Sequence, residues 1–441
     1  MLKKLISLCA AAALAISCAG CTKTETAVTS SVSKPSVTIK IAYNSSKYGD
    51  AWIQSAANDF KKFNNEVSVQ LAGDSQLDSK VGYSLLAGSQ DADIVFVSKT
   101  NWQLWAKSGY MTNLGALYSA ATAGGETFSS KVRSDMLGAC KYSGAYYIAP
   151  WGDGVTGLIY NKKLFEKNNW SVPTTVKQLI QLIDVIKSAH YTPFSWSGQD
   201  DGCWDDIVND WWIQYEGADS IAQYLKLGSP EVYKQTGRVK ALKAFQGVAA
   251  NPLNSVSNPT GIDAKKAADS FYSGNVAMMP GGYLSMLETK YKAPSGFSMA
   301  MMKLPTVVDS KQTDLSATLA GGFAFIPSTS KNKDMAEKFL LFLASDDELA
   351  AFTQKTGCPA PYNYDPTTVK SLDTLAQSEA ELWYAAKKYY MYSDNPKYYN
   401  DYLDWPGTGS PLMRIFLGTL TPQQAVDQNY EYAKANWSTS K

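Results

Sequence analysis

Residues 37–41 read Val-Thr-Ile-Lys-Ile, and this alternation of apolar and other side chains predicts a β-strand. Apolar residues at helical spacing follow over 52–63, then come a second strand at 67–71, a helix at 77–85 and a short buried strand at 93–97. This order of strand, helix, strand, helix, strand predicts an α/β fold in which a largely parallel sheet is covered by helices on both faces.

The carboxyl ends of these three strands are where we expect a ligand. In open α/β sheets, ligands bind in the crevice beyond the carboxyl ends of the strands. Those ends are residues 43–45, 72–74 and 98–102, and they carry Asn44, Gln76 just beyond the second end, and Trp102.

A second region begins at 146–154, a tract rich in glycine and proline, and leads into a predicted strand at 157–160. A helix is predicted after Pro173, because Thr175 and Gln178 have the spacing of a capping box. Glycine and proline are dense again near 280, at 321–322 and at 357–361. An amphipathic helix is predicted over 333–344, and a last helix begins with Thr421 as N-cap and Pro422 in its first turn.

The N-terminus has the pattern of an exported protein. A basic start at residues 1–4 precedes an apolar run at 5–16, which is too short for a stable membrane span and predicts a signal peptide over 1–20. The small residues before Cys21 resemble a bacterial lipobox, so we expect a lipid on Cys21; lipidation of Cys18 and cleavage without a lipid are the alternatives. Residues 21–36 are mostly Thr, Ser, Lys and small residues, which predicts a flexible tether.

Composition narrows the class of partner. Lys plus Arg number 41 against 40 for Asp plus Glu, and no basic stripe is visible, so we expect no nucleic-acid partner. The chain beyond the tether exceeds what a single core usually serves, which favours two domains. It has no second long apolar run, so we expect this part to be soluble.

Cysteine and histidine are sparse in the folded part. Cys140, Cys203 and Cys358 remain after the N-terminal segment, which permits one disulfide at most, and buried free thiols are the simpler interpretation. The single histidine, His190, follows a helical pattern and favours a helix-end role over catalysis or metal binding. Nothing in the sequence indicates a metal site or a cofactor.

Five stretches carry a resemblance to a known family, and their order and spacing cover nearly the whole mature chain. The most specific is Tyr-Asn-Lys-Lys-Leu-Phe at 160–165. The others are Asp-Ile-Val-Phe at 93–96 with 105–110, the tract 271–278 before Gly281-Gly282, the helix near 330–343, and Leu-Thr-Pro-Gln-Gln-Ala at 420–425. Together they resemble the family 1 extracellular solute-binding proteins of ABC importers, the family of maltose-binding protein.

The resemblance implies a two-lobed periplasmic-binding-protein type II fold, with two mixed sheets flanked by helices and three hinge crossings. Residues 37–150 plus 281–357 would form the N-terminal lobe, and 151–280 plus 358–441 the C-terminal lobe. The tracts near 150, 280 and 358 are suited to the crossings, because a few such residues can absorb the backbone rotations of hinge closure.

The resemblance also implies a function. We expect a monomeric receptor without catalysis, held by its lipid on the outer face of a bacterial, Gram-positive cell membrane. It would bind an oligosaccharide between its lobes and deliver it to the membrane permease subunits of an ABC transporter.

Aromatic and polar residues near predicted loops are the candidate sugar contacts. A pyranose ring presents one face of C–H groups and a rim of hydroxyls, so its receptor needs flat apolar rings together with amides or carboxylates. The chain has 12 Trp and 27 Tyr to supply the rings. The candidates are Asn44, Gln76, Trp102, Trp151, Asp153, Trp196, Gln199, Asp200, Trp204, Tyr283 and Trp405. Trp204 also belongs to a helical stripe with Trp211, a pattern more typical of a core.

Two other function classes stay open. A carbohydrate-active enzyme would need two carboxylates about 5 to 10 Å apart across the scissile bond. A surface glycan sensor or adhesin could use the same scaffold without transport. A peptide, a polyamine or a sugar phosphate are alternative ligands, although the near-neutral charge and the aromatic supply favour a neutral glycan.

Overall fold

The computed structural model describes residues 37–98, 100–199, 202–256, 259–288, 293–317, 322–389, 405 and 410–437. The predicted signal peptide, the tether and Cys21 lie outside these ranges, as does Asp200. Among the described residues, no helix is both long and apolar enough to cross a membrane.

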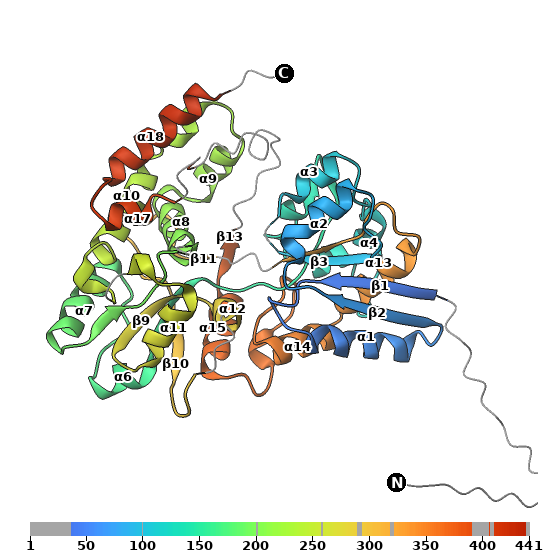
Figure 1. Cartoon of the computed structure of the whole chain (residues 1–441), viewed down its shortest axis with the longest axis horizontal. Helices are drawn as coiled ribbons and strands as arrows, with labels where there is room; N and C mark the ends of the chain where they lie inside the picture. The colour runs from blue at the N-terminus through green and yellow to red at the C-terminus, as the bar shows by residue number, and fades with distance from the viewer. Residues whose placement is uncertain are drawn as a thin grey trace, which may run out of the picture. The chain divides into compact units, whose positions relative to one another are not determined.

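The first sheet is built from the segment that opens the folded chain. Strand β1 (Val37–Tyr43) pairs in parallel with both β2 (Val67–Gly73) and β3 (Ile94–Val97), which confirms the parallel sheet predicted from residues 37–97. Helices α1 (Ala51–Phe63) and α2 (Leu77–Leu86) connect these strands (Figure 1). Two strands from later in the chain complete the sheet: β12 pairs antiparallel with both β3 and β6, so β6 runs in the same direction as β3. Across the sheet the order is β2 (Val67–Gly73), β1 (Val37–Tyr43), β3 (Ile94–Val97), β12 (Phe323–Phe325) and β6 (Ala149–Pro150).

The second sheet is also mixed. β7 pairs antiparallel with both β9 and β10, and β8 pairs in parallel with β9. Its order is β10 (Met299–Met302), β7 (Gly157–Asn161), β9 (Val276–Gly281) and β8 (Thr192–Phe194). Since β10 hydrogen-bonds to β7, the return of the chain to the first sheet comes after β10. We therefore propose a lobe boundary between β10 and β12 in place of the one expected at residue 281.

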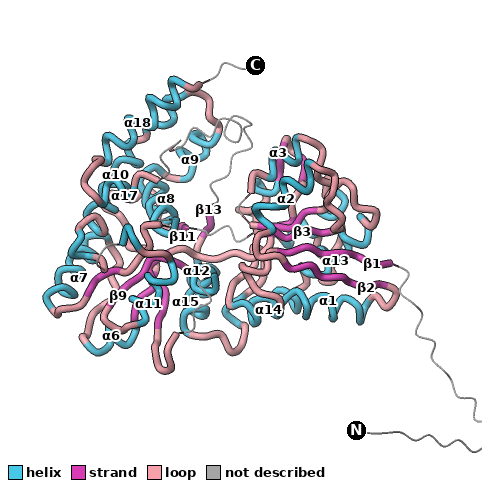
Figure 2. Tube along the Cα trace, in the orientation of Figure 1, coloured by secondary structure: helices cyan, strands magenta, loops and turns pink. Residues whose placement is uncertain are grey.

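Helices flank both sets of strands (Figure 2). Those near the first sheet include α3 (Trp102–Lys107), α4 (Gly115–Ser119), α5 (Phe128–Lys131), α13 (Lys333–Leu343) and α14 (Asp346–Thr356). Between β7 and β9 come α6 (Lys162–Lys167), α7 (Val176–Ser188), α8 (Gly202–Glu216), α9 (Ala218–Leu225), α10 (Thr236–Val248) and α11 (Ala264–Tyr272). The remaining helices are α12 (Tyr283–Glu288), α15 (Thr374–Ala385), α17 (Leu412–Phe416) and α18 (Pro422–Ala435).

Short elements complete the described chain. β4 (Lys141–Tyr142) and β5 (Ala145–Tyr146) form a small hairpin, and β11 (Leu315–Ala317) pairs in parallel with β13 (Lys387–Tyr389). Single 3₁₀ turns lie at Gly138–Cys140, Pro230–Lys234, Pro252–Asn254, Pro259–Gly261 and Pro366–Thr368.

Capping chemistry fixes helix ends where the sequence predicted it. The Thr175 side chain accepts from the Gln178 N–H, while the Gln178 side chain accepts from the Thr175 N–H. Thr421 and Gln424 form the same kind of capping box at the start of α18. His190 lies just past α7 with φ at +62°, and its N–H donates to the Lys187 carbonyl, so it does sit at a helix end. Among the described residues, Cys140, Cys203 and Cys358 form no disulfide.

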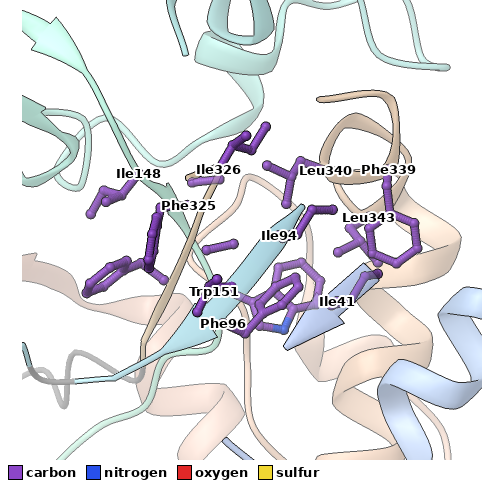
Figure 3. Close-up of a cluster of buried hydrophobic side chains, with 14 of the residues drawn as sticks. Ile41, Ile94, Phe96, Ile148, Trp151, Phe325, Ile326, Phe339, Leu340 and Leu343 are labelled. Carbon is purple, nitrogen blue, oxygen red and sulfur yellow. The ribbon is translucent and has the colours of Figure 1, made fainter. Parts of the chain in front are cut away.

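Buried side chains gather in distinct clusters. The first sheet, α1 and α13 enclose one cluster, in which Ile41 and Ile94 meet Phe339 (Figure 3). A second cluster lies around α8 and α10 and holds Trp204 and Trp211. A smaller third cluster surrounds α15 and β10.

A single carboxylate ties β1 to the start of α13. Asp93, just before β3, accepts from the backbone N–H of Lys40 at 2.9 Å, from Ser330 Oγ at 2.7 Å and from Asn332 Nδ2 at 3.2 Å. It is 5% exposed. These bonds give a physical reason for an aspartate just before β3, because its carboxylate links β1 to the segment that precedes α13.

We predict that Asp93→Ala lowers the free energy of unfolding by about 3 kcal/mol, because it removes a buried carboxylate and leaves three partly buried donors without this acceptor. Asp91→Ala is the matched control: Asp91 pairs with Lys40 at the surface with its side chain 79% exposed, so its loss should leave stability essentially unchanged. Urea unfolding of both variants measures the difference. Equal midpoints would contradict the role given to Asp93.

Candidate functional site

An open hollow lies where β1 and β3 end. It holds about 290 Å³ of space, with the open solvent at its mouth included. Every lining residue comes from the first sheet or the segments next to it. They are Tyr43, Asn44, Lys47, Tyr48, Trp52, Phe96, Val97, Ser98, Trp151, Gly322 and Phe323.

Asn44 follows β1 directly and is held by its neighbours. Its backbone N–H donates to the Phe96 carbonyl at 3.1 Å, which continues the pairing of β1 with β3. Its side-chain Oδ1 accepts from the N–H of Ser46 at 3.0 Å and from Ser46 Oγ at 2.7 Å. The acceptor oxygen is thus engaged within the loop, and the Nδ2 donor is the group that Asn44 can offer to a ligand.

Ser98 follows β3 directly, and Asp78 of α2 fixes its position. Its backbone N–H donates to Asp78 Oδ1 at 3.2 Å, and its hydroxyl donates to Asp78 Oδ2. The side chain of Asp78 at the first turn of α2 therefore sets the position of this strand end.

Trp151 reaches the hollow from the end of β6. Its backbone N–H donates to the Gly322 carbonyl at 2.9 Å, and its ring stacks on Trp52 with centroids 5.3 Å apart and 30° between planes. Figure 3 shows the indole beside Phe96. The side chain is 3% exposed, and Nε1 has no hydrogen-bond partner within the described part of the chain. A buried indole N–H without an acceptor costs free energy, which a ligand acceptor could recover.

Close backbone approach at Gly322 brings β3 and Trp151 together. With φ at +150°, a Cβ on Gly322 would lie 2.7 Å from the Val97 carbonyl oxygen. A side chain here would push apart the strands that form the floor of the hollow, and glycine tolerates this conformation.

Electrostatically, the hollow is close to neutral. Among the described residues that line it, Lys47 carries the formal charge and no residue is acidic. Tyr43 donates to Asp50 Oδ1 at 2.9 Å, and burial, followed by this bond, raises the pKa of its phenol to about 12. Tyr43 thus remains a neutral hydroxyl throughout the physiological range.

The structure brings Asn44 and Trp151 together among the predicted residues. Trp102 is near but buried: it opens α3 at 4% exposure and packs edge-on against Phe323 at 6.2 Å. It is not among the residues that line the hollow. Trp102 thus supports a lining residue from behind.

Trp196 and Trp204 lie in the second core. Trp196 is 1% exposed, donates from Nε1 to Ser255 Oγ at 2.8 Å and packs edge-on against Phe416. Trp204 is fully buried against Phe194 and Phe245. Both rings are covered by core side chains, so we leave them out of the proposed site as stacking surfaces.

Asp153 and Tyr283 each form a hydrogen bond at one end of α15. Asp153 is 1% exposed and accepts from Trp383 Nε1 at 2.9 Å and from the Gly154 N–H at 2.8 Å. The Tyr283 hydroxyl donates to Asp373 Oδ2 at 3.1 Å. These residues join segments of the chain and do not line the hollow.

The remaining candidates are placed elsewhere. Gln76 caps α2 at the surface and Gln199 is exposed, while Asp200 is outside the described residues. Trp405 lies over Arg238, with the guanidinium carbon 4.3 Å from the centre of the indole ring. The backbone N–H of Trp405 donates to Asn429 Oδ1. Gln76, Gln199 and Trp405 are separate from the hollow.

A sequence profile described as bacterial extracellular solute-binding protein matches residues 43–350 of the chain, well over half of its length. The chain belongs to this family. The match begins at the end of β1, where the hollow starts, and runs into α14.

Individual relatives of this solute-binding protein are distant. A multiple sugar-binding protein of Streptococcus mutans is 22% identical over 322 residues, which cover 72% of this chain and 73% of that protein. The structure of RafE in complex with raffinose superposes with a TM-score of 0.68 at 19% identity, covering 91% of this chain and 100% of that one. The GacH receptor of Streptomyces glaucescens gives 0.69 at 18%, covering 92% and 99%. These likenesses confirm the expected two-lobed α/β fold.

Sequence reasoning missed several lining residues of this solute-binding protein. Lys47 and Tyr48 are not among the predicted residues, and Trp52 enters the sequence prediction only through the apolar helical pattern over 52–63. The available signal was position: Lys47 and Tyr48 follow Asn44 within four residues, in the loop that leaves β1 at the expected edge. Trp52 opens α1 from the same loop, and periodicity alone showed only that one of its faces is buried.

Proposed function

We propose that this solute-binding protein is a lipid-anchored receptor on the outer face of a bacterial, Gram-positive cell membrane. It binds an oligosaccharide and delivers it to ABC permease subunits without chemical change, and it acts as a monomer. The observation that carries the proposal is the hollow at the edge of the first sheet, which is lined by aromatic rings and neutral polar groups. Trp151 is one of the lining residues, and its buried Nε1 has no hydrogen-bond partner among the described residues.

The lining suits an uncharged sugar. Trp52, Trp151 and Phe323 contribute largely buried aromatic side chains to the lining, while Asn44 and Tyr43 supply polar groups that stay neutral. A sugar hydroxyl can accept from one donor and donate to another acceptor, so such a mixed lining matches it better than it matches a polyamine. A cationic polyamine would meet Lys47 and no carboxylate among the described lining residues.

Names of the relatives agree with this ligand class. One is called a multiple sugar-binding protein, and two structures are described as complexes with raffinose or with acarbose. An oligosaccharide is longer than the hollow, so we propose that Gln76, Gln199, Asp200 and Trp405 contact further sugar units, in part from the second lobe. We propose that Asp153 and Tyr283 influence sugar binding indirectly, through the chain segments that they connect to α15.

Catalysis is the less favoured alternative. Glycoside hydrolysis needs two carboxyl groups about 5 to 10 Å apart at the scissile bond. The described residues that line the hollow include no carboxylic acid. A glycan sensor or adhesin on the same fold would share the site and differ only in its partner.

We predict that neutral oligosaccharides raise the melting temperature of the purified protein, whereas peptides, polyamines and sugar phosphates do not. Ligand at 100 times its dissociation constant should stabilise the fold by about 2.7 kcal/mol. Chromatography of the incubated sugar should return it intact. Fragments would indicate an enzyme, and normal sugar uptake in a deletion strain would favour a sensor.

We predict that Trp151→Phe weakens sugar binding about tenfold, because it removes the indole N–H and keeps an aromatic ring. The smaller ring leaves space in a buried aromatic cluster and should also lower the stability of the ligand-free protein, so affinity is measured at a temperature where the variant is fully folded. Isothermal titration calorimetry measures the affinity. Trp105→Phe is the control, because Trp105 packs against Phe325 away from the lining. Wild-type affinity in Trp151→Phe would move the site elsewhere.

We predict that Cys21→Ala moves the protein from the membrane fraction to the medium, because it removes the proposed attachment site of the lipid. Immunoblots of fractionated cells measure the distribution, with Cys18→Ala as the matched control. If Cys18→Ala releases the protein and Cys21→Ala does not, the lipid is on Cys18. Release in neither variant would contradict a cysteine-linked anchor.

A further inference from the structure

Helix α15 holds the segment that leaves the first sheet for the second. This segment, residues 151–156, runs from β6 to β7. Near the end of α15, Trp383 Nε1 donates to Asp153 Oδ2 at 2.9 Å. At its start, the N-cap Asp373 accepts from the Tyr283 hydroxyl at 3.1 Å.

Between these two contacts, one carboxyl group joins both partner segments. Glu379 Oε1 accepts from the Val155 N–H at 2.9 Å, and Oε2 accepts from the Tyr283 N–H at 2.6 Å. Glu379 is fully buried. Backbone on either side packs closely on it, because a Cβ on Gly154 would lie 2.7 Å from Oε1.

Tyr283 connects this group to two clusters of buried residues. It opens α12, whose Leu284 is buried in the first cluster and whose Met286 is buried in the third. Its ring also lies against Gly357, where a Cβ would come within 2.3 Å of it. Glu379 therefore links α15 to the segment between the sheets and to the start of α12.

We propose that Glu379 is a latch in the hinge of this protein: its two hydrogen bonds fix Val155 and Tyr283 to α15, and hinge motion requires one of these bonds to open. The inference deepens the proposed function, because a receptor that closes around a sugar needs a hinge with a defined resting state. The latch gives this hinge a dependence on pH.

The sign of that dependence follows from the environment of Glu379. Burial is the main cause that raises the pKa of this carboxyl to about 7; the Asp153 and Asp373 carboxylates also raise it, and the two backbone bonds lower it. Tyr283 and Tyr364 lie nearby with phenol pKa values raised by burial, so they stay neutral. When the latch opens to solvent, the pKa of Glu379 returns toward its ordinary value of 4.5.

The closed latch therefore binds a proton more tightly than the open one. Its stability is fully present below about pH 4.5, is lost as pH rises toward about 7, and is constant above that. Acid thus favours the latched arrangement, and the wild-type protein loosens at this point between pH 5 and pH 7.

Amide hydrogen exchange by NMR on the ligand-free protein tests the latch directly. After correction for intrinsic exchange, we expect protection of the Val155 and Tyr283 amides to fall about tenfold or more between pH 5 and pH 7. The Asn44 amide, which donates to a backbone carbonyl, should show no such change.

The matched variants are Glu379→Gln and Glu381→Gln, the latter at an exposed position on the same helix. In Glu379→Gln the pH dependence should disappear, because an amide has no proton to lose in this pH range. Glu381→Gln should behave as wild type.

Wild-type protection that is flat from pH 5 to pH 7 would overturn the proposal, even if Glu379→Gln fails to fold. A pH dependence that persists in a folded Glu379→Gln would overturn it as well. No sugar enters this experiment, so the latch can fail while the binding proposal stands, and the reverse.

Discussion

The parallel pairing of β1 with β2 and β3 is the constraint on which the rest of the structure depends. It brings the ends of β1 and β3 to one edge of the sheet, where Asn44 and Ser98 line the same hollow. The antiparallel β12 then delivers Gly322 to the same edge, and Gly322 binds the backbone of Trp151. Four separate parts of the chain thus form one hollow because their strands share a sheet.

Most of the tryptophans predicted as sugar platforms serve as core. Trp196 and Trp204 fill the second cluster, and Trp102 supports Phe323. A sequence shows that a ring stands near a strand end, but the direction of the ring depends on packing across elements distant in the chain. Trp151 illustrates the difference: its face is covered by Trp52, and its N–H is the group left without a partner.

Local patterns predicted local structure well. The strand at 37–41, the capping box at Thr175, the N-cap at Thr421 and the buried stripe from Trp204 to Trp211 are all confirmed, since each depends on neighbours within a few residues. The membership of β10 in the second sheet could not be predicted, because it depends on pairing with β7, more than a hundred residues earlier. The same non-local packing places Glu379 between Val155 and Tyr283.

The central claim is that a sugar binds in the hollow and takes a hydrogen bond from Trp151 Nε1. The most direct measurement is a ¹⁵N–¹H spectrum of the indole groups with and without saturating ligand. We expect a large shift of the Trp151 indole signal, while the signals of Trp196 and Trp204 stay in place. Binding that leaves the Trp151 signal unmoved, or that moves the buried rings of the second core instead, would contradict it.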